Sequence, residues 1–268
     1  MDGGLKDWRD TLEDLGLLGL VPPPPDPSLR PPVPEPPARP VAAPQRSRAL
    51  SPPSSPPAAP VWTPPTDAVG CPPREAVASA ATLAELEARV QGCLACPLGP
   101  GRLRFVFGEG NPSADLMFIG EGPGRDEDLQ GRPFVGRAGE LLDKMIGAIG
   151  LERSEVYIAN VVKCRPPDNR VPTASEAQRC LGYLMRQIDL IQPRVIVTLG
   201  ATPLRELLGV GEGITRVRGQ WKRLEPQGIP VMPTFHPAYV LRQYTDDVRR
   251  AVWTDLKAAR AWLDRPKG

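Results

Sequence analysis

The chain has 268 residues, enough for one or two globular domains. With 41% hydrophobic and 24% charged residues, its composition is that of an ordinary globular protein, and no apolar run reaches the roughly 18 residues that span a bilayer. These features exclude a membrane protein. The net charge of +2 at pH 7 is too small to identify a polyanionic partner.

The first 20 residues mix acidic, basic and apolar side chains. Leu5, Trp8, Leu12 and Leu15 recur at helical spacing, which favours an amphipathic helix within residues 1–20 that binds a protein partner. A disordered tail that contains a tryptophan explains the same pattern. The acidic residues here are unlike the basic and apolar regions of a secretory signal, so we expect a cytoplasmic protein.

Prolines are concentrated in the next segment, since 21 of the 36 lie between Pro22 and Pro73. Such a sequence favours extended polyproline II structure and has too few large apolar groups to offset chain entropy. We therefore expect residues 21–80 to form a disordered linker and residues 81–268 to form one folded domain.

From about Thr82 the sequence alternates between helical and strand patterns. Thr82 with Glu85, and Thr173 with Glu176, form capping boxes that begin amphipathic helices. Short apolar runs predict strands buried on both faces, at residues 116–119, 156–159, 195–199 and 229–235. The expected fold class is α/β, a three-layer α/β/α sandwich around a central, mainly parallel sheet of about four strands.

Polar residues follow three of these runs, where the predicted strands end. Glu121 comes after the first run, Asn160 after the second and His236 after the fourth. Because the carboxyl ends of parallel strands share one edge of the sheet, we expect a carboxylate, an amide and an imidazole to converge there. Each residue alone also has an ordinary explanation: a solvated acid in a turn, an amide that satisfies nearby backbone groups, or a structural histidine.

Four cysteines have the spacing of metal ligands. Cys93 and Cys96 form a C-x-x-C pair, and Cys164 and Cys180 provide two further thiols. In a reducing compartment such thiols indicate ligands rather than disulfides. Four thiolates suit either tetrahedral zinc or an iron-sulfur cubane, and the spacing does not distinguish them. Cys71 lies in the proline-rich segment and is interpreted as an unrelated thiol.

The order of these motifs resembles that of the family 4 uracil-DNA glycosylases over about residues 82–263. The shared motifs are Cys93-x-x-Cys96, Gly120-Glu-Gly-Pro-Gly124, Gly131-Arg-Pro-Phe-Val-Gly136, Asn160-x-x-x-Cys164-Arg-Pro-Pro167, Cys180 and His236-Pro-Ala-Tyr-Val-Leu-Arg242. The resemblance implies a 4Fe-4S cluster held by Cys93, Cys96, Cys164 and Cys180. It also implies a DNA repair hydrolase that removes uracil from single- or double-stranded DNA and leaves an abasic site.

Uracil removal gives the matching residues distinct roles. His236 would donate a hydrogen bond to uracil O2, where negative charge develops. Glu121 would orient or activate the attacking water, and Asn160 would recognise O4 and N3–H of the base. The resemblance also implies that Gly122, Phe134 and Glu127 contact the substrate, Phe134 by stacking on the flipped ring and Glu127 as a second acid. A core phenylalanine and a solvated loop charge are the alternatives for these last two residues.

The segment after His236 suits a DNA duplex. Tyr239, Val240 and Leu241 would fill the gap left by the extruded base, and Arg242 would contact a phosphate. The ordinary alternative for these four residues is the first turn of a helix.

Two rival classes of protein remain. One is a non-catalytic DNA-binding or polymerase-associated module with a structural metal cluster, and the other is a cysteine-ligated zinc or redox protein. We expect uracil-containing DNA as the substrate and a monomeric protein.

Overall fold

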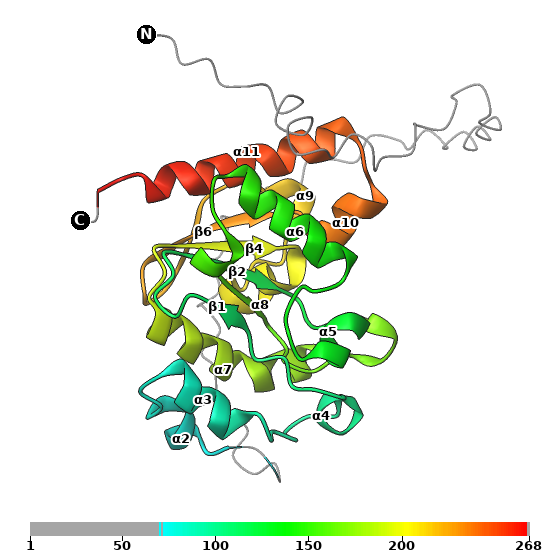
Figure 1. Cartoon of the computed structure of the whole chain (residues 1–268), viewed down its shortest axis with the longest axis vertical. Coiled ribbons are helices and arrows are strands. Elements are labelled where there is room, and N and C mark those ends of the chain that lie inside the picture. Colours follow the sequence, from blue (N-terminus) through cyan, green and yellow to red (C-terminus); the bar gives the residue numbers. More distant parts are fainter. Residues whose placement is uncertain (1–69, 71, 267–268) are drawn as a thin grey trace, which may run out of the picture. The chain divides into compact units, whose positions relative to one another are not determined.

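The computed structural model describes residue 70 and residues 72–266, so the predicted N-terminal helix, most of the predicted linker and Cys71 lie outside the described residues. In the described part, six strands form one sheet in the order β1-β3-β2-β4-β6-β5 (Figure 1). The central strands are parallel: β3 (Tyr157–Asn160), β2 (Leu116–Gly120), β4 (Val195–Leu199) and β6 (Ile229–Thr234). They correspond to the four predicted runs, and the parallel core of the sheet is confirmed.

Two short antiparallel strands border this core. β1 (Glu109–Gly110) pairs with β3, and β5 (Lys222–Leu224) pairs with β6. The prediction of about four strands therefore omitted the two edge strands, which are too short to show an alternating pattern in the sequence.

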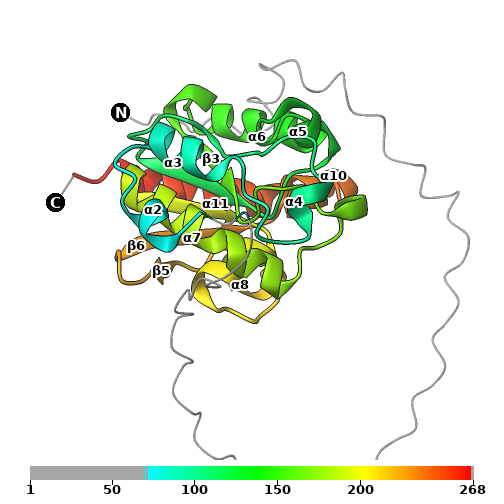
Figure 2. The ribbon, with the colours of Figure 1, turned by 90° about the horizontal axis from the view of Figure 1, so that it is seen from below.

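Helices cover both faces of the sheet and make the three predicted layers (Figures 1 and 2). On one face, Met117 and Ile119 pack with residues of α3 (Leu83–Val90), α7 (Ala174–Ile191) and α8 (Ala201–Leu208). On the other, Leu116 and Phe118 pack with residues of α6 (Arg137–Ala148) and α11 (Asp246–Leu263). Adjacent residues of β2 thus alternate between two apolar cores, which is why the run is apolar throughout.

The remaining helical elements are short. They are α2 (Arg74–Ala78), α4 (Leu98–Gly101), α5 (Arg125–Gln130), η3 (Arg153–Glu155), η4 (Pro167–Asn169), α9 (Ile214–Val217) and α10 (Pro237–Arg242). Helix α2 lies within the range predicted as linker. Val77 is 4% and Ala80 0% exposed, so the folded region begins earlier than the predicted boundary because these side chains join the core.

The two predicted helix starts are confirmed by their caps. The Thr82 hydroxyl accepts a hydrogen bond from the Glu85 backbone N–H at 3.1 Å, and Thr173 accepts one from the Glu176 N–H at 3.3 Å. Each satisfies a backbone donor that the first helical turn leaves unpaired. Within residues 70 and 72–266, no helix combines the length and apolar character that crossing a membrane requires.

Candidate active site

The amide of Asn160 and the ring of Phe134 meet above the last residue of β2. Gly120 pairs in register with Asn160 on the neighbouring strand. A Cβ atom added to Gly120 would stand 2.4 Å from Asn160 Oδ1 and 2.5 Å from Phe134 Cζ, closer than such atoms can approach. Glycine at this position therefore makes room for both side chains at the carboxyl edge of the sheet.

Asn160 has an unused hydrogen-bond acceptor. The residue is 2% exposed, and its Oδ1 is buried without a hydrogen-bond partner. Its backbone carbonyl, in contrast, accepts a hydrogen bond from Lys163 Nζ at 3.0 Å, which fixes the end of the strand. An unpaired buried polar atom costs about 1–3 kcal/mol, so it indicates a group that a ligand completes.

His236 is a neutral hydrogen-bond donor at the start of α10. Its Nδ1 accepts a hydrogen bond from the Ala238 backbone N–H at 3.0 Å, which places the ring proton of the neutral imidazole on Nε2. Burial, aided by the positive charge of Arg242, lowers the pKa of His236 to about 4. The imidazole is therefore uncharged at neutral pH, and its Nε2–H is available to a ligand.

The imidazole and the phenylalanine ring lie side by side. The ring centroids of Phe134 and His236 are 5.7 Å apart, with an angle of 30° between the planes. A Cβ atom on Gly200, the residue between β4 and α8, would stand 3.3 Å from His236 Cβ. The ends of β2, β3, β4 and β6 thus contribute to one site, as the strand-end pattern predicted.

A hydrogen bond from Thr202 holds Glu121 at the same edge of the sheet. The Thr202 hydroxyl donates a hydrogen bond to Glu121 Oε2 at 2.5 Å. Thr202 lies in the first turn of α8, two residues after the Gly200 that contacts His236, and is 4% exposed. The sequence analysis assigned no role to Thr202, because a threonine in a helical turn gives no sign of its partner 81 residues earlier.

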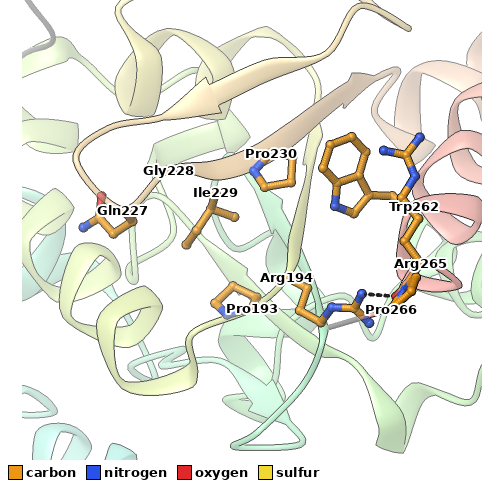
Figure 3. A pocket seen from close by; sticks show the side chains of 9 residues that line it. All are labelled: Pro193, Arg194, Gln227, Gly228, Ile229, Pro230, Trp262, Arg265 and Pro266. Atoms are coloured by element: carbon orange, nitrogen blue, oxygen red, sulfur yellow. Dashed lines mark hydrogen bonds between the residues drawn. The ribbon is translucent and has the colours of Figure 1, made fainter. Parts of the chain in front are cut away.

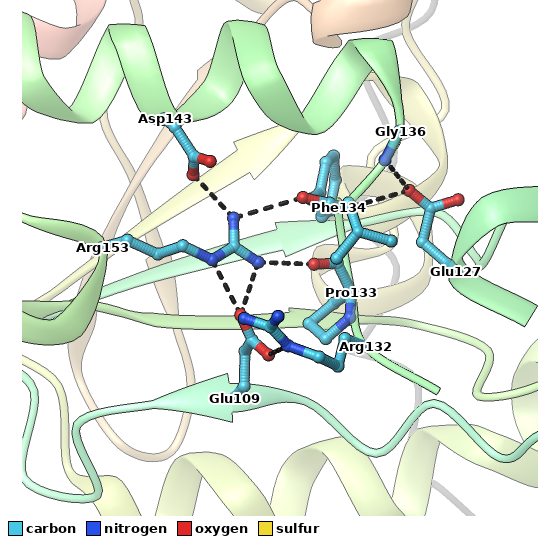
Figure 4. Close-up of polar contacts among 9 residues, drawn as sticks. Glu109, Glu127, Arg132, Pro133, Phe134, Gly136, Asp143 and Arg153 are labelled. Carbon is cyan, nitrogen blue, oxygen red and sulfur yellow. Dashed lines mark hydrogen bonds and ion pairs between the residues drawn. The ribbon is translucent and has the colours of Figure 1, made fainter. Parts of the chain in front are cut away.

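The structure places Glu127 on backbone amides. Its carboxylate accepts hydrogen bonds from the N–H groups of Val135 at 3.0 Å and Gly136 at 3.1 Å (Figure 4). It also accepts one from the N–H of Gly124 at 3.0 Å. These bonds connect the glycine-rich turn after β2 to the loop that carries Phe134. Both carboxylate oxygens are occupied in this way, an arrangement that suits positioning of the two loops better than the predicted second acid.

Gly122 has a packing role that only glycine can fill. A Cβ atom at this position would stand 2.6 Å from Val162 Cγ2. The missing side chain therefore lets the turn that carries Glu121 lie against the segment after β3.

The predicted DNA wedge is only partly at the surface. Val240 is 3% exposed and belongs to the core beneath α6 and α11, so it does not reach a duplex. Tyr239 is half-buried, and its ring packs against Phe235 with centroids 4.9 Å apart. Leu241 is half-buried and Arg242 is exposed.

The four cysteines of the folded region are gathered at one place. Cys93, Cys164 and Cys180 are buried, and Cys96 is partly buried. Burial raises the pKa of Cys164 to about 11, against the opposing effect of Arg102, and the charges of Cys96 and Cys93 raise it further. Burial also raises the pKa of Cys180, as do the charges of Cys164 and Cys96. The four thiols thus lie within electrostatic range of one another.

Donors from the surrounding protein reach two of these sulfur atoms. The Tyr183 hydroxyl donates to Cys93 Sγ at 3.1 Å, and Arg102 donates to Cys164 Sγ at 3.5 Å. Hydrogen-bond donors of this kind stabilise the deprotonated, thiolate form of a cysteine. Among the residues described, no group of three or more His, Cys, Asp or Glu side chains has the arrangement of a metal-ion site. Among the described residues, these four thiols are the side chains that could hold a thiolate-bound group.

Two cavities of the structure lie away from the reacting groups. One of about 350 Å³ is next to Arg194, which precedes β4, and to Trp262 of α11 (Figure 3). Another of about 260 Å³ borders Asp115 and Leu116, where β2 begins. Both are at the amino-terminal ends of strands, whereas Asn160 and His236 follow carboxyl ends. Neither of these two cavities includes Asn160, Phe134 or His236.

Comparison with known proteins agrees with the motifs and the geometry. Residues 107–257 match the family model of the uracil DNA glycosylase superfamily. The type-4 uracil-DNA glycosylase of Thermotoga maritima is 48% identical over 181 residues, which cover 66% of this chain and 92% of that protein. Those of Sulfurisphaera tokodaii and Archaeoglobus fulgidus are 46% and 42% identical, with 69% and 66% of this chain and 87% and 90% of the relatives covered. The chain therefore belongs to the type-4 branch of the uracil DNA glycosylase superfamily.

Proposed function

We propose that this protein is a uracil-DNA glycosylase that hydrolyses the bond between uracil and deoxyribose in DNA and leaves an abasic site. The observation that carries the proposal is the buried, unpaired Oδ1 of Asn160, which lies next to the ring of Phe134 and close to a neutral imidazole. An amide with a free acceptor, an aromatic face and an uncharged donor together match an everted pyrimidine.

His236 stabilises the leaving base. When the C–N bond breaks, the electron pair goes to uracil and negative charge develops on O2, while positive charge develops on the sugar. The Nε2–H of the neutral imidazole donates to O2, and a well-placed donor of this kind contributes about 3–4 kcal/mol to the transition state. Since the Ala238 N–H occupies Nδ1, the ring keeps the tautomer that donation requires.

Glu121 acts on the deoxyribose side of the bond that breaks. Its carboxylate orients a water molecule, whose hydroxyl adds to C1′ and whose proton leaves to the base, and its negative charge complements the cationic sugar. Thr202 occupies one carboxylate oxygen, Oε2, and so leaves Oε1 for the water.

Asn160 distinguishes uracil from cytosine. Its Oδ1 accepts from uracil N3–H, and its side-chain NH2 donates to O4. Cytosine presents the opposite pattern, an acceptor at N3 and a donor at C4, so it satisfies the amide only when the side chain is turned by half a rotation. The ring of Phe134 replaces part of the stacking that the base loses when it leaves the duplex.

The four cysteines would hold a 4Fe-4S cluster. The support is a set of four thiols, three of them buried, that lie within electrostatic range of one another. When bound, the cluster joins the segment after α3, the segment after β3 and helix α7, and hydrolysis requires no electron transfer from it. Arg102 and Tyr183 stabilise its thiolates through their hydrogen bonds to sulfur.

The decisive experiment is incubation of the full chain with a labelled oligonucleotide that contains one uracil, followed by alkaline cleavage at abasic sites. We expect cleavage at uracil and none at cytosine or thymine in matched oligonucleotides. His236→Ala should lower turnover by orders of magnitude and leave the protein folded, with a melting temperature lowered only by the loss of the hydrogen bond from the Ala238 N–H. An intact, iron-loaded protein that binds the oligonucleotide and releases no uracil would instead indicate a non-catalytic DNA-binding module.

The extent of the catalytic region is tested by truncation. Deleting residues 1–69 should spare uracil release, because the described fold that forms the site begins at about residue 70. A large loss of intrinsic rate in the truncated protein would show that the N-terminal segment belongs to the enzyme.

A further inference from the structure

Phe134 has an unfavourable backbone conformation. Its φ angle is +50°, in the left-handed region that residues with a bulky side chain rarely adopt. Such a conformation persists only where the surrounding structure imposes it, and it is often found at functional sites. The conformation directs the phenylalanine ring to Asn160 and His236, so something must hold it there.

Arg153 holds the two peptide groups that flank Phe134. Its guanidinium donates to the carbonyl of Pro133 at 2.5 Å and to that of Phe134 at 3.2 Å (Figure 4). These carbonyls belong to the peptide planes before and after the Phe134 Cα atom. Because the orientations of both planes define φ and ψ of the residue between them, one planar side chain fixes both angles.

The guanidinium is itself held by two carboxylates. Glu109 of β1 accepts from Arg153 Nε at 2.7 Å, and Asp143 of α6 accepts from Nη1 at 2.7 Å. Arg153 lies in η3, immediately before β3, so it links the edge of the sheet and α6 to the Phe134 loop. A side chain with acidic partners from two elements loses little further freedom when it binds the carbonyls.

Two further residues support the loop that carries Phe134: Gly139 leaves room for it, and Glu127 binds its backbone. A Cβ atom on Gly139 would stand 1.9 Å from the Phe134 carbonyl oxygen, so only glycine allows α6 to approach this closely. Glu127 binds the N–H groups of Val135 and Gly136. Glu127 therefore fixes the residues after Phe134, whereas Arg153 fixes the peptide groups on both sides of it.

We propose that Arg153 is a positioning residue for base excision, which keeps the Phe134 ring over the pyrimidine site by holding the strained backbone from outside the pocket. The effect of Arg153 on the kinetics of excision rests on the proposed function. Arg153 has no part in the chemical step, because its donors are directed to backbone carbonyls and acidic side chains.

Arg153→Met tests the proposal, and Arg194→Met is the matched control. Both arginines are 21% exposed, and Arg194 also donates to two carbonyls, those of Leu263 and Arg265 at the end of α11. We expect Arg153→Met to weaken inhibition by free uracil and to lower kcat/KM, each at least about tenfold, while Arg194→Met changes both less than about twofold. A folded Arg153→Met protein with both values within twofold of wild type would overturn the proposal.

Arg153→Lys covers the case in which Arg153→Met does not fold. Lysine keeps the charge for Glu109 and Asp143 but lacks the planar fork that binds both carbonyls, so the same losses are expected.

A second substitution, Phe134→Ala, shows whether the effect of Arg153 passes through the phenylalanine ring. When Phe134→Ala is already present, adding Arg153→Lys should lower kcat/KM by less than about a further twofold. If the two substitutions instead lower kcat/KM independently, so that their effects multiply, Arg153 does not act through Phe134.

NMR of His236 provides a readout that needs no substrate. His236 is the only histidine of the chain, and its imidazole lies 5.7 Å from the Phe134 ring, whose ring current it senses. The imidazole C–H signals should shift in Arg153→Lys and remain in place in Arg194→Met. Unshifted signals in Arg153→Lys would refute the positioning role, whereas an inactive wild-type enzyme would refute only the proposed function.

Discussion

The uncharged state of His236 can be tested by one pH titration. Its pKa of about 4 compares with about 6.5 for an unperturbed histidine, and the main cause is burial, with a smaller effect of Arg242. A difference of roughly 2.5 units corresponds to about 3 kcal/mol between the two protonation states. A charged imidazole at this site would therefore lower the stability of the fold by an amount comparable to the catalytic contribution expected of the neutral donor.

The sign of the pH dependence follows from the direction of the shift. Between pH 6.5 and about 4 the unfolded chain binds a proton at this residue and the folded protein does not. The free energy of unfolding should therefore be unaffected by His236 above about pH 6.5, and should fall by up to about 3 kcal/mol as the pH drops to about 4. Excision should not require a protonated histidine, so its rate should show no loss attributable to His236 until the pH approaches 4.

The assay is a titration of protein labelled with ¹³C and ¹⁵N in histidine, which gives the signals of one imidazole because the chain has one histidine. We expect an apparent pKa of about 4 and nitrogen shifts typical of a proton on Nε2. Arg242→Gln, which removes the secondary cause, should raise the pKa modestly. A pKa near 6.5, or a proton on Nδ1, would refute the buried neutral donor and with it the role assigned to His236.

Three further predictions test the rest of the site. Gly120→Ala should lower uracil excision by at least about a hundredfold, because its Cβ would collide with Asn160 Oδ1 and Phe134, while Gly147→Ala, with no atom within 4 Å of the added Cβ, should leave the rate unchanged in the same oligonucleotide assay. Asn160→Asp should also lose about a hundredfold or more on uracil because a carboxylate cannot donate to O4, and wild-type activity of this variant would show that the side chain does not recognise the base. Cys180→Ala should lose absorbance near 400 nm, bind fewer than four iron atoms per chain and melt at a lower temperature, and full iron content would exclude Cys180 as a ligand.

The sequence predicted those parts of the fold that repeat a strong local pattern. β2 and β4 are buried at every residue, so their apolar runs identified them almost to the residue. β1 has two residues and β5 three, too few for any periodicity. Helix α2 was missed because Arg74–Ala78 follows directly on the proline-rich composition, and its burial depends on α3 and on α7, which lies about a hundred residues later.

The candidate site was predictable where topology alone brings residues together. Parallel strands align their carboxyl ends, which was enough to bring Asn160, Glu121 and His236 to the same edge of the sheet. The supporting residues were not predictable, since the partners of Thr202 and Arg153 are set by tertiary packing. Val240 shows the same limit, because only the phase of α10 against the core decides which of its residues faces outward.

The four-residue separation of Asn160 and Cys164 has a consequence for damage to the enzyme. Every residue between them is fully buried, and the N–H groups of Val161 and Val162 donate to the carbonyls of Gly120 and Glu121. These hydrogen bonds connect the segment that carries Cys164 to the glycine-rich turn that carries Glu121. If the proposed cluster is bound by Cys164, an oxidant that removes its iron should lower uracil excision before it unfolds the domain, and excision lost only together with the fold would contradict this coupling.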